Sequence, residues 1–220
     1  MSFTQPQGRP MVSVVSATTT IGALSGAALA SSAAAVAIGA LVGLTWGLIV
    51  GRTADWLSRR AAWGQALARW SLYLGALVAT TLFGGALFQM MQYASALSVP
   101  QTLLGLMRPP LGGGFTFFVV FNSLLEWLLL PSILCLNWHL ARRRRLIIAS
   151  VILYYLSRAW TYLYFVPRIF EFLEVSTGGS LRADLVSQMI HWVNLSWIRA
   201  ASDGVVAVLL LLATSRSDQK

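Results

Sequence analysis

Four ionisable side chains lie inside long apolar stretches of the chain, where an isolated charge is costly. Glu126 and Arg158 interrupt two successive apolar runs, and Arg199 and Asp203 stand four residues apart in a third, on one helical face. An uncompensated charge at the centre of a bilayer costs several kcal/mol, with estimates from about 3 to above 10 kcal/mol. We therefore expect the four side chains to meet inside the protein, where such residues are by default candidates for a functional site.

Four consecutive arginines, the basic segment 142–145, give a reference for the depth of these charges. Glu126 lies 16 residues before this segment and Arg158 13 residues after it, so they are ~24 Å and ~20 Å away at about 1.5 Å per helical residue. Asp203 and Arg199 lie ~20 Å and ~26 Å from the basic C-terminal tail. Two acids and two arginines on three helices thus lie at one level, and their formal charges balance, as burial in a medium of low dielectric constant requires.

Other polar and aromatic side chains accompany the four charges. Asn122 shares a helical face with Glu126, and Tyr162 shares one with Arg158. Two interpretations stay open: a buried charge network that fixes the register of the helices, or a pocket that holds a hydrophobic small molecule. In such a pocket His191 can act as a base or a pH-sensitive donor; otherwise it is an interfacial residue at the start of a helix. The side chains that would line the pocket are Trp160, Tyr162, Tyr164, His191, Trp192 and Asn194.

Composition places the chain in the membrane class. Of its 220 residues 57% are hydrophobic and 10% charged, and no polar stretch is long enough for a separate soluble domain. The net charge of +9 comes from arginines at the ends of apolar runs, a pattern typical of membrane orientation and not of a nucleic-acid-binding surface. The single cysteine, Cys135, excludes an intramolecular disulfide, and no Cys/His spacing indicates a metal site, so we expect neither a metal nor a cofactor.

The apolar runs predict an all-α integral membrane protein with about five transmembrane helices. Each run of the central hairpin exceeds the roughly 20 residues that cross a bilayer, and neither shows the polar face of a soluble helix. We predict a four-helix transmembrane bundle over residues 66–220, preceded over residues 1–65 by a tail, a glycine-rich helix and an interfacial connector. The five predicted spans are 28–51, 71–97, 115–138, 146–172 and 191–214, with loops over 98–114 and 171–187.

Glycines recur every fourth residue in the first predicted span, at Gly39, Gly43, Gly47 and Gly51. This glycine-zipper pattern puts small residues on one helical face, which lets another helix approach closely. The pattern leaves open whether that helix belongs to the same chain. It also leaves open whether residues 11–32 span the membrane, lie at its interface or form a re-entrant segment.

Sidedness follows from the distribution of positive residues. With five spans, one side of the membrane carries ten positive residues and the other carries four. The positive-inside rule then puts the C-terminus in the cytoplasm and the N-terminus outside, in what we expect to be a bacterial inner membrane. A re-entrant N-terminal hairpin would move only the N-terminus to the inside. The connector, residues 52–69, carries Trp56, Trp63 and Trp70 beside arginines, which predicts a helix lying at the headgroup boundary.

Two short motifs carry a family resemblance. Residues 161–167 read Thr-Tyr-Leu-Tyr-Phe-Val-Pro and are followed by Ile169 and Phe172, and Trp192 stands seven residues before Arg199. On these motifs the chain from Arg69 to Ala213 resembles the anthrone oxygenase-like family of small four-helix membrane proteins. The resemblance implies a cofactor-free oxygenase fold that acts on aromatic anthrones, with Trp192 and Arg199 on its functional face. The family pattern favours asparagine at the positions held here by Ile169 and Ser196.

Two functions from different classes follow. We expect a non-catalytic structural or accessory subunit of a larger membrane complex of the bioenergetic or photosynthetic type, because the glycine pattern offers a packing surface and no catalytic constellation is recognised. The alternative is a cofactor-free oxygenase-like enzyme, or a binder of hydrophobic aromatic ligands, that uses an intramembrane pocket. The expected partners are the lipid bilayer and other membrane subunits, with a hydrophobic small molecule under the alternative and no nucleic acid.

Overall fold

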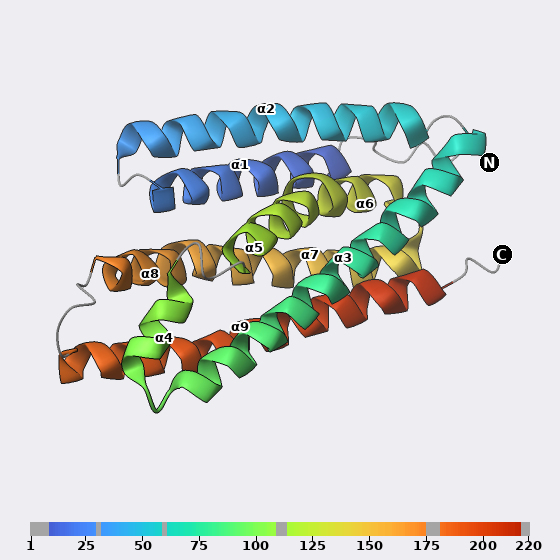
Figure 1. Ribbon diagram of the computed structural model, residues 1–220. Coiled ribbons are helices and arrows are strands. Elements are labelled where there is room, and N and C mark those ends of the chain that lie inside the picture. The colour runs from blue at the N-terminus through green and yellow to red at the C-terminus, as the bar shows by residue number, and fades with distance from the viewer. Residues whose placement is uncertain (1–8, 30–31, 59–60, 109–113, 175–180, 217–220) are drawn as a thin grey trace.

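The computed structural model describes residues 9–29, 32–58, 61–108, 114–174 and 181–216, and the regular structure in these ranges is entirely helical (Figure 1). Nearly all helices are α-helices; two short π-helical segments are labelled η. In chain order the elements are α1 (Arg9–Leu29), α2 (Ala33–Ser58), α3 (Ala61–Ala96), α4 (Pro100–Met107), α5 (Gly114–Ser123), η1 (Leu124–Leu129), α6 (Leu130–Leu136), α7 (Ala141–Trp160), η2 (Thr161–Phe165), α8 (Val166–Leu173) and α9 (Ala183–Ser215).

The chain is an all-α membrane protein, as its sequence predicts. Within the described residues six helices are long and apolar enough to cross a membrane, so the expected count of five is not confirmed. The additional helix is α1, whose threonines lower its hydropathy. In the structure each hydroxyl of Thr18, Thr19 and Thr20 donates a hydrogen bond to a backbone carbonyl of the preceding turn. Because these donors are satisfied within the helix, they are compatible with a hydrocarbon environment.

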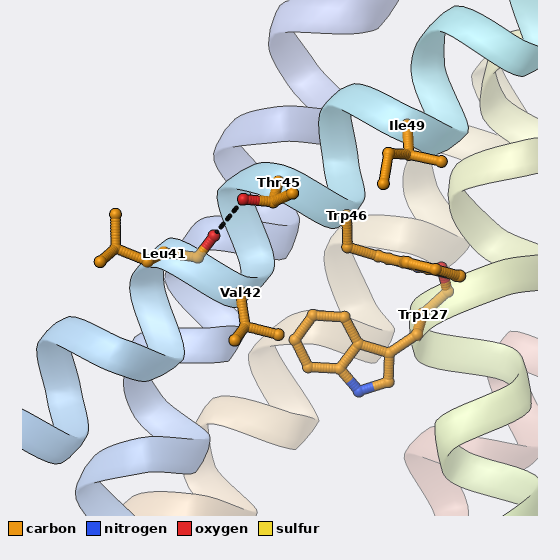
Figure 2. A pocket seen from close by; sticks show the side chains of 6 residues that line it. All are labelled: Leu41, Val42, Thr45, Trp46, Ile49 and Trp127. Carbon is orange, nitrogen blue, oxygen red and sulfur yellow. Dashed lines mark hydrogen bonds between the residues drawn. The ribbon is translucent and has the colours of Figure 1, made fainter.

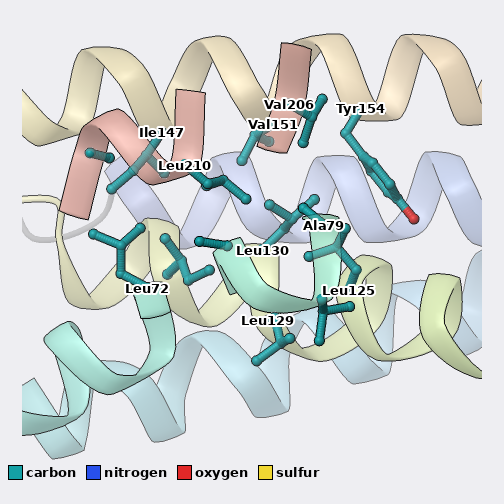
Figure 3. Packing of buried hydrophobic residues seen from close by; sticks show 14 of the residues in the cluster. Leu72, Ala79, Leu125, Leu129, Leu130, Ile147, Val151, Tyr154, Val206 and Leu210 are labelled. Carbon is teal, nitrogen blue, oxygen red and sulfur yellow. The ribbon is translucent and has the colours of Figure 1, made fainter. Parts of the chain in front are cut away.

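A bundle of four long elements forms the core. It consists of α3, the continuous run α5–η1–α6, the continuous run α7–η2–α8, and α9, which packs against both α3 and α7. Each element contributes a fully buried aliphatic side chain to one apolar cluster: Leu72, Leu130, Ile147 and Leu210 (Figure 3). A second buried cluster, which includes Met90, Phe165, Phe172 and Trp192, fills the other half of the bundle.

Helices α1 and α2 form an antiparallel hairpin beside this bundle (Figure 1). The glycines of α2 face α1 of the same chain, which answers the question that the sequence pattern leaves open. A Cβ atom on Gly39 would lie 2.0 Å from the carbonyl oxygen of Gly22, and one on Gly43 would lie 2.1 Å from that of Thr18. Only glycine permits the two backbones to approach this closely. The N-terminal part is therefore a two-helix hairpin, where a single glycine-rich helix was expected.

Two further expectations change in the structure. The interfacial connector is not a separate helix: Trp56 lies in α2, and Trp63 and Trp70 lie in α3, all three exposed. The predicted loop over 98–114 contains the short helix α4, which buries Leu103, Leu104 and Met107. The predicted N-terminal tail lies mostly outside the described residues.

Each π-helical segment ends two residues before a proline. The backbone N–H of Leu130 donates to the carbonyl of Leu125, and that of Val166 donates to Thr161, both with the five-residue spacing of a π-helix. Pro131 and Pro167 follow directly. Proline has no N–H to donate, and its ring collides with the carbonyl of the fourth residue before it. Widening the preceding turn relieves that collision, so the prolines account for both segments.

Candidate functional site

Glu126 and Arg158 form an ion pair between the two central runs of the bundle, which confirms the prediction that they face each other. The Arg158 Nε donates to Glu126 Oε2 at 2.8 Å, and the Glu126 side chain is 1% exposed. Arg158 Nη2 also donates to the Tyr162 hydroxyl at 2.8 Å, and that hydroxyl donates to Glu126 Oε1 at 3.3 Å. The guanidinium lies 4.7 Å from the centre of the Tyr162 ring. The three side chains thus close a ring of hydrogen bonds.

The π-helical segments position this ring. Glu126 lies in η1, Tyr162 lies in η2, and Arg158 lies in the last turn of α7 directly before η2. A π-helical turn rotates the side chains that follow it relative to an uninterrupted α-helix, and such turns are frequent at functional sites. The sequence signal for both segments is the proline that follows each of them, at positions 131 and 167.

Two tyrosines that sequence reasoning missed extend the ring. The Tyr154 hydroxyl donates to Asn122 Oδ1 at 3.0 Å, and the Tyr155 hydroxyl donates to the backbone carbonyl of Glu126 at 2.7 Å. In the π register that carbonyl would pair with the N–H at position 131, which proline lacks. We call the six residues of this assembly the charge network: Asn122, Glu126, Tyr154, Tyr155, Arg158 and Tyr162.

Helix α1 covers the charge network from the side opposite α9. It packs against α6, α7 and η2. The network is therefore enclosed between the bundle and the hairpin α1–α2. A carboxylate in this position is shielded from lipid on both sides, which is the environment that a buried ion pair needs.

Arg199 and Asp203 lie near the network but are not joined to it by an ion pair. Asp203 interacts electrostatically with both Arg199 and Arg158. Among the described residues neither Arg199 nor Asp203 makes a side-chain hydrogen bond or an ion pair, and the Arg199 guanidinium stacks 4.9 Å from the centre of the Phe165 ring. The four charges gather in one part of the bundle, but only Glu126 and Arg158 bind each other.

The remaining site residues predicted from the sequence divide into two groups. Trp192 is buried: its Nε1 donates to the carbonyl of Phe165 at 3.3 Å, and its ring meets those of Tyr93, Phe165 and Phe172. His191 and Asn194 are exposed. Trp160 and Tyr164 each contact the Phe165 ring edge to face and so belong to the aromatic group around Trp192.

The two principal cavities lie away from the charge network. The larger of the two principal cavities, about 470 Å³, lies between α2 and η1 and is lined by Trp46 and Trp127, as Figure 2 shows. The other, about 320 Å³, lies between α3 and α9 at Phe83 and Gly204. Neither cavity is lined by a residue of the charge network. The part of the chain that the structure describes holds no group of three or more His, Cys, Asp or Glu residues that could bind a metal ion.

Comparison of the chain with known protein families, with curated proteins and with solved structures gave no match.

Proposed function

We propose that this chain is a non-catalytic accessory subunit of a larger membrane complex. The observation that carries the proposal is the closure of the charge network. Glu126 accepts hydrogen bonds from Arg158 and Tyr162, and α1 packs against the elements that carry Arg158 and Tyr162. Charges that satisfy one another in this way hold helices together and leave none of these three groups free to act on a substrate.

A second face of the molecule supports the presence of a partner. The glycine face of α2 already packs against α1, so a helix of a partner subunit must bind to another surface. The longest helices, α3 and α9, offer one at the cavity beside Gly204, where Val205 and Val208 are exposed. Gly84 of α3 is exposed as well, and a Cβ atom there would meet nothing within 4 Å. An exposed glycine that follows Phe83, one of the residues lining this apolar hollow, favours the packing of a transmembrane helix from another subunit.

The substitution Gly84→Leu tests this proposal. The added side chain enters open space, so the isolated chain keeps its fold, whereas a partner helix on this face is displaced. Native mass spectrometry after mild detergent extraction then shows the partner on the wild type and its loss from the variant. Ala37→Leu, on the exposed face of α2, is the matched control and keeps the partner. A wild-type chain that co-purifies with no other protein contradicts the proposal.

A specific observation favours a second candidate function, the binding of a hydrophobic aromatic ligand. The Arg199 guanidinium has five N–H donors, and no described side chain or carbonyl accepts from them. It lies beside the aromatic group of Phe165 and Trp192. A membrane-soluble aromatic molecule with an oxygen acceptor would complete this site, in line with the resemblance to the anthrone oxygenase-like family. Under this candidate the aromatic group contacts the ligand.

Anthrone itself is the probe for the second candidate. Arg199→Gln removes the charge and most donors from a side chain that makes no hydrogen bond or ion pair with the described residues, so folding is preserved while binding weakens roughly tenfold. Arg168→Gln, in the exposed pair of Arg168 and Glu171, is the control and binds as the wild type does. Equilibrium dialysis measures both. Equal affinities in the wild type and in the Arg199 variant contradict this function.

The orientation of the chain in a bacterial inner membrane is also a proposal. Six spans put the start of α1 and the end of α9 on one side, in agreement with their position at one end of the molecule (Figure 1). That side then carries eleven positive residues and the other carries three. The positive-inside rule assigns the richer side to the cytoplasm. The N-terminus is thus placed inside, where five spans would have put it outside, and alkaline phosphatase fusions at both ends, inactive in the cytoplasm, test this.

A further inference from the structure

Four arginines stand at the N-terminal end of α7, where the helix already carries the positive end of its dipole. The helix begins at Ala141, so the basic segment 142–145 occupies its second to fifth positions, and its first turn contains no acidic residue. Positive side chains are unfavourable at this end of a helix, because its first backbone N–H groups have no partners within the helix. An anion bound at this end relieves both effects.

The backbone at the start of α7 supplies unused hydrogen-bond donors. The N–H of Arg144 donates to the carbonyl of Leu140 at 2.8 Å and closes the first turn. Within the described residues the N–H groups of residues 141–143 have no acceptor, and no side chain caps the helix at Leu140. Free N–H groups at the start of a helix of 20 residues are the arrangement by which proteins hold phosphate groups.

Two of the four arginine side chains are fixed in place by contacts with the protein. Arg143 is 8% exposed, and its Nε donates to the backbone carbonyl of Arg216, at the end of α9, at 2.6 Å. The Arg144 guanidinium lies 5.4 Å from the centre of the Trp138 ring, and its Nη1 donates to the Trp138 carbonyl at 3.2 Å. Each guanidinium uses one nitrogen in these bonds, so its other N–H groups stay available.

Neither guanidinium is neutralised by a neighbouring acid. Among the described residues no Asp or Glu forms an ion pair with the basic segment 142–145 or with Arg216. A cation that is nine-tenths buried and unpaired is unfavourable. Arg143 therefore needs a negative charge that the described part of the chain does not supply.

The position of this site identifies the anion. The basic segment lies at the start of the membrane span Ala141–Leu173, and the span Ala183–Ser215 ends one residue before Arg216. Figure 1 shows the start of α7 and the end of α9 at the same end of the molecule. Both spans therefore meet the headgroup layer here, where the phosphates of lipids are the available anions. A zwitterionic headgroup brings its own cation toward the four arginines, so a lipid with a net negative charge is favoured.

We propose that the start of α7 binds the phosphate of an anionic phospholipid. The backbone N–H groups of residues 141–143 and the guanidinium groups of Arg143 and Arg144 donate to the phosphate oxygens, and the acyl chains lie along the apolar part of α7. The site belongs to the ends of α7 and α9, so it depends neither on the subunit proposal nor on Arg199.

Phosphatidylglycerol is the probe, and phosphatidylcholine with the same acyl chains is the reference lipid. The purified full chain in a mild neutral detergent is titrated with each lipid, and native mass spectrometry measures the bound fraction. We expect the wild type to bind phosphatidylglycerol roughly tenfold more tightly than phosphatidylcholine, because charge-assisted hydrogen bonds are the stronger ones.

Two variants at the site and one matched control locate this preference. Arg143→Gln and Arg144→Gln each remove one fixed guanidinium, so most of the preference for phosphatidylglycerol is lost. Arg69→Gln removes the same charge from an exposed arginine near the start of α3 and leaves the preference unchanged. Circular dichroism of each variant separates loss of binding from loss of fold, and the half-buried Arg144 carries the test if the Arg143 variant does not fold.

Four outcomes overturn the proposal. The first is equal affinity of the wild type for the two lipids. The second is an Arg144→Gln variant that folds normally and keeps the full preference. The third is an equal loss in Arg69→Gln, because a diffuse attraction to the positive end of the molecule would then explain the binding. The fourth is complete displacement of phosphatidylglycerol by an excess of inorganic phosphate, because the site would then belong to a soluble anion.

Discussion

The ion pair of Glu126 and Arg158 gives the sharpest test of the charge network. Replacing Arg158 with methionine fills similar volume without a charge, and it leaves Glu126 with only the 3.3 Å bond from Tyr162. Because the Glu126 side chain is 1% exposed, water cannot replace the lost partner. Removing one member of such a buried pair costs about 3–5 kcal/mol. Protonation of the isolated carboxyl group limits the loss, so we expect the lower end of that range.

The assay is thermal unfolding in a mild detergent, followed by circular dichroism. For a chain of this size 1 kcal/mol corresponds to about 2–4 °C, so the Arg158→Met variant unfolds roughly 6–12 °C below the wild type. Arg168→Met is the matched control, since Arg168 and Glu171 form an ion pair whose side chains are 43% and 54% exposed. Exposed pairs contribute at most about 1 kcal/mol, so the control variant unfolds within a few degrees of the wild type.

A double-mutant cycle decides whether the two charges act on each other. Adding Glu126→Gln to Arg158→Met removes the orphaned carboxylate, and a neutral amide of the same shape takes its place. We expect the double variant to recover about half or more of the lost stability, because a neutral amide is cheaper to bury than an unpaired charge. Losses that simply add, within about 0.5 kcal/mol, would refute the view that the network ties the helices together.

Two further predictions concern the backbone. Gly43→Ala forces the hairpin apart and destabilises the chain by about 1–3 kcal/mol. Gly84→Ala adds a methyl group in open space, so it is neutral or stabilises the chain by up to about 1 kcal/mol. Thermal unfolding of both variants checks this contrast, and equal effects contradict it. Tyr155→Phe leaves the backbone carbonyl of Glu126 without a donor and lowers the free energy of unfolding by about 1–2 kcal/mol. In a Pro131→Ala background this loss falls toward zero, because a new backbone N–H reaches that carbonyl. The same loss in both backgrounds would show that Pro131 is not the reason why this carbonyl needs the tyrosine.

Helix depth was predictable from the sequence because the rise of a helix is nearly constant. Counting outward from the basic segment 142–145 puts Glu126 and Arg158 at one level, and the structure pairs them. The same counting puts Arg199 and Asp203 close by, but depth alone does not decide which charges bind each other. That choice depends on the rotation of each helix, which the π-helical segments change.

The rest of the network could not be predicted by counting. From the sequence, Tyr154 and Tyr155 look like packing residues in an apolar run. The hydrogen bond that Tyr155 makes is explained only by the backbone carbonyl of Glu126, which Pro131 leaves without a donor. The sequence left open whether residues 11–32 span the membrane, because hydropathy treats threonine as polar. In α1 the hydroxyls of Thr18 and Thr19 donate hydrogen bonds to the helix's own backbone, so neither donor is left unsatisfied in the hydrocarbon layer.

The cover that α1 places on the charge network has a consequence for how the chain is made. The hairpin α1–α2 is synthesised first and is held together by contacts between neighbouring segments, so it can form as soon as both helices are in the bilayer. Its contact with η2 needs residues that the ribosome adds more than a hundred positions later. Before those residues are added, the hairpin is a preformed unit. Its packing against α7 and η2 is then the step that shields Glu126 and Arg158 from lipid.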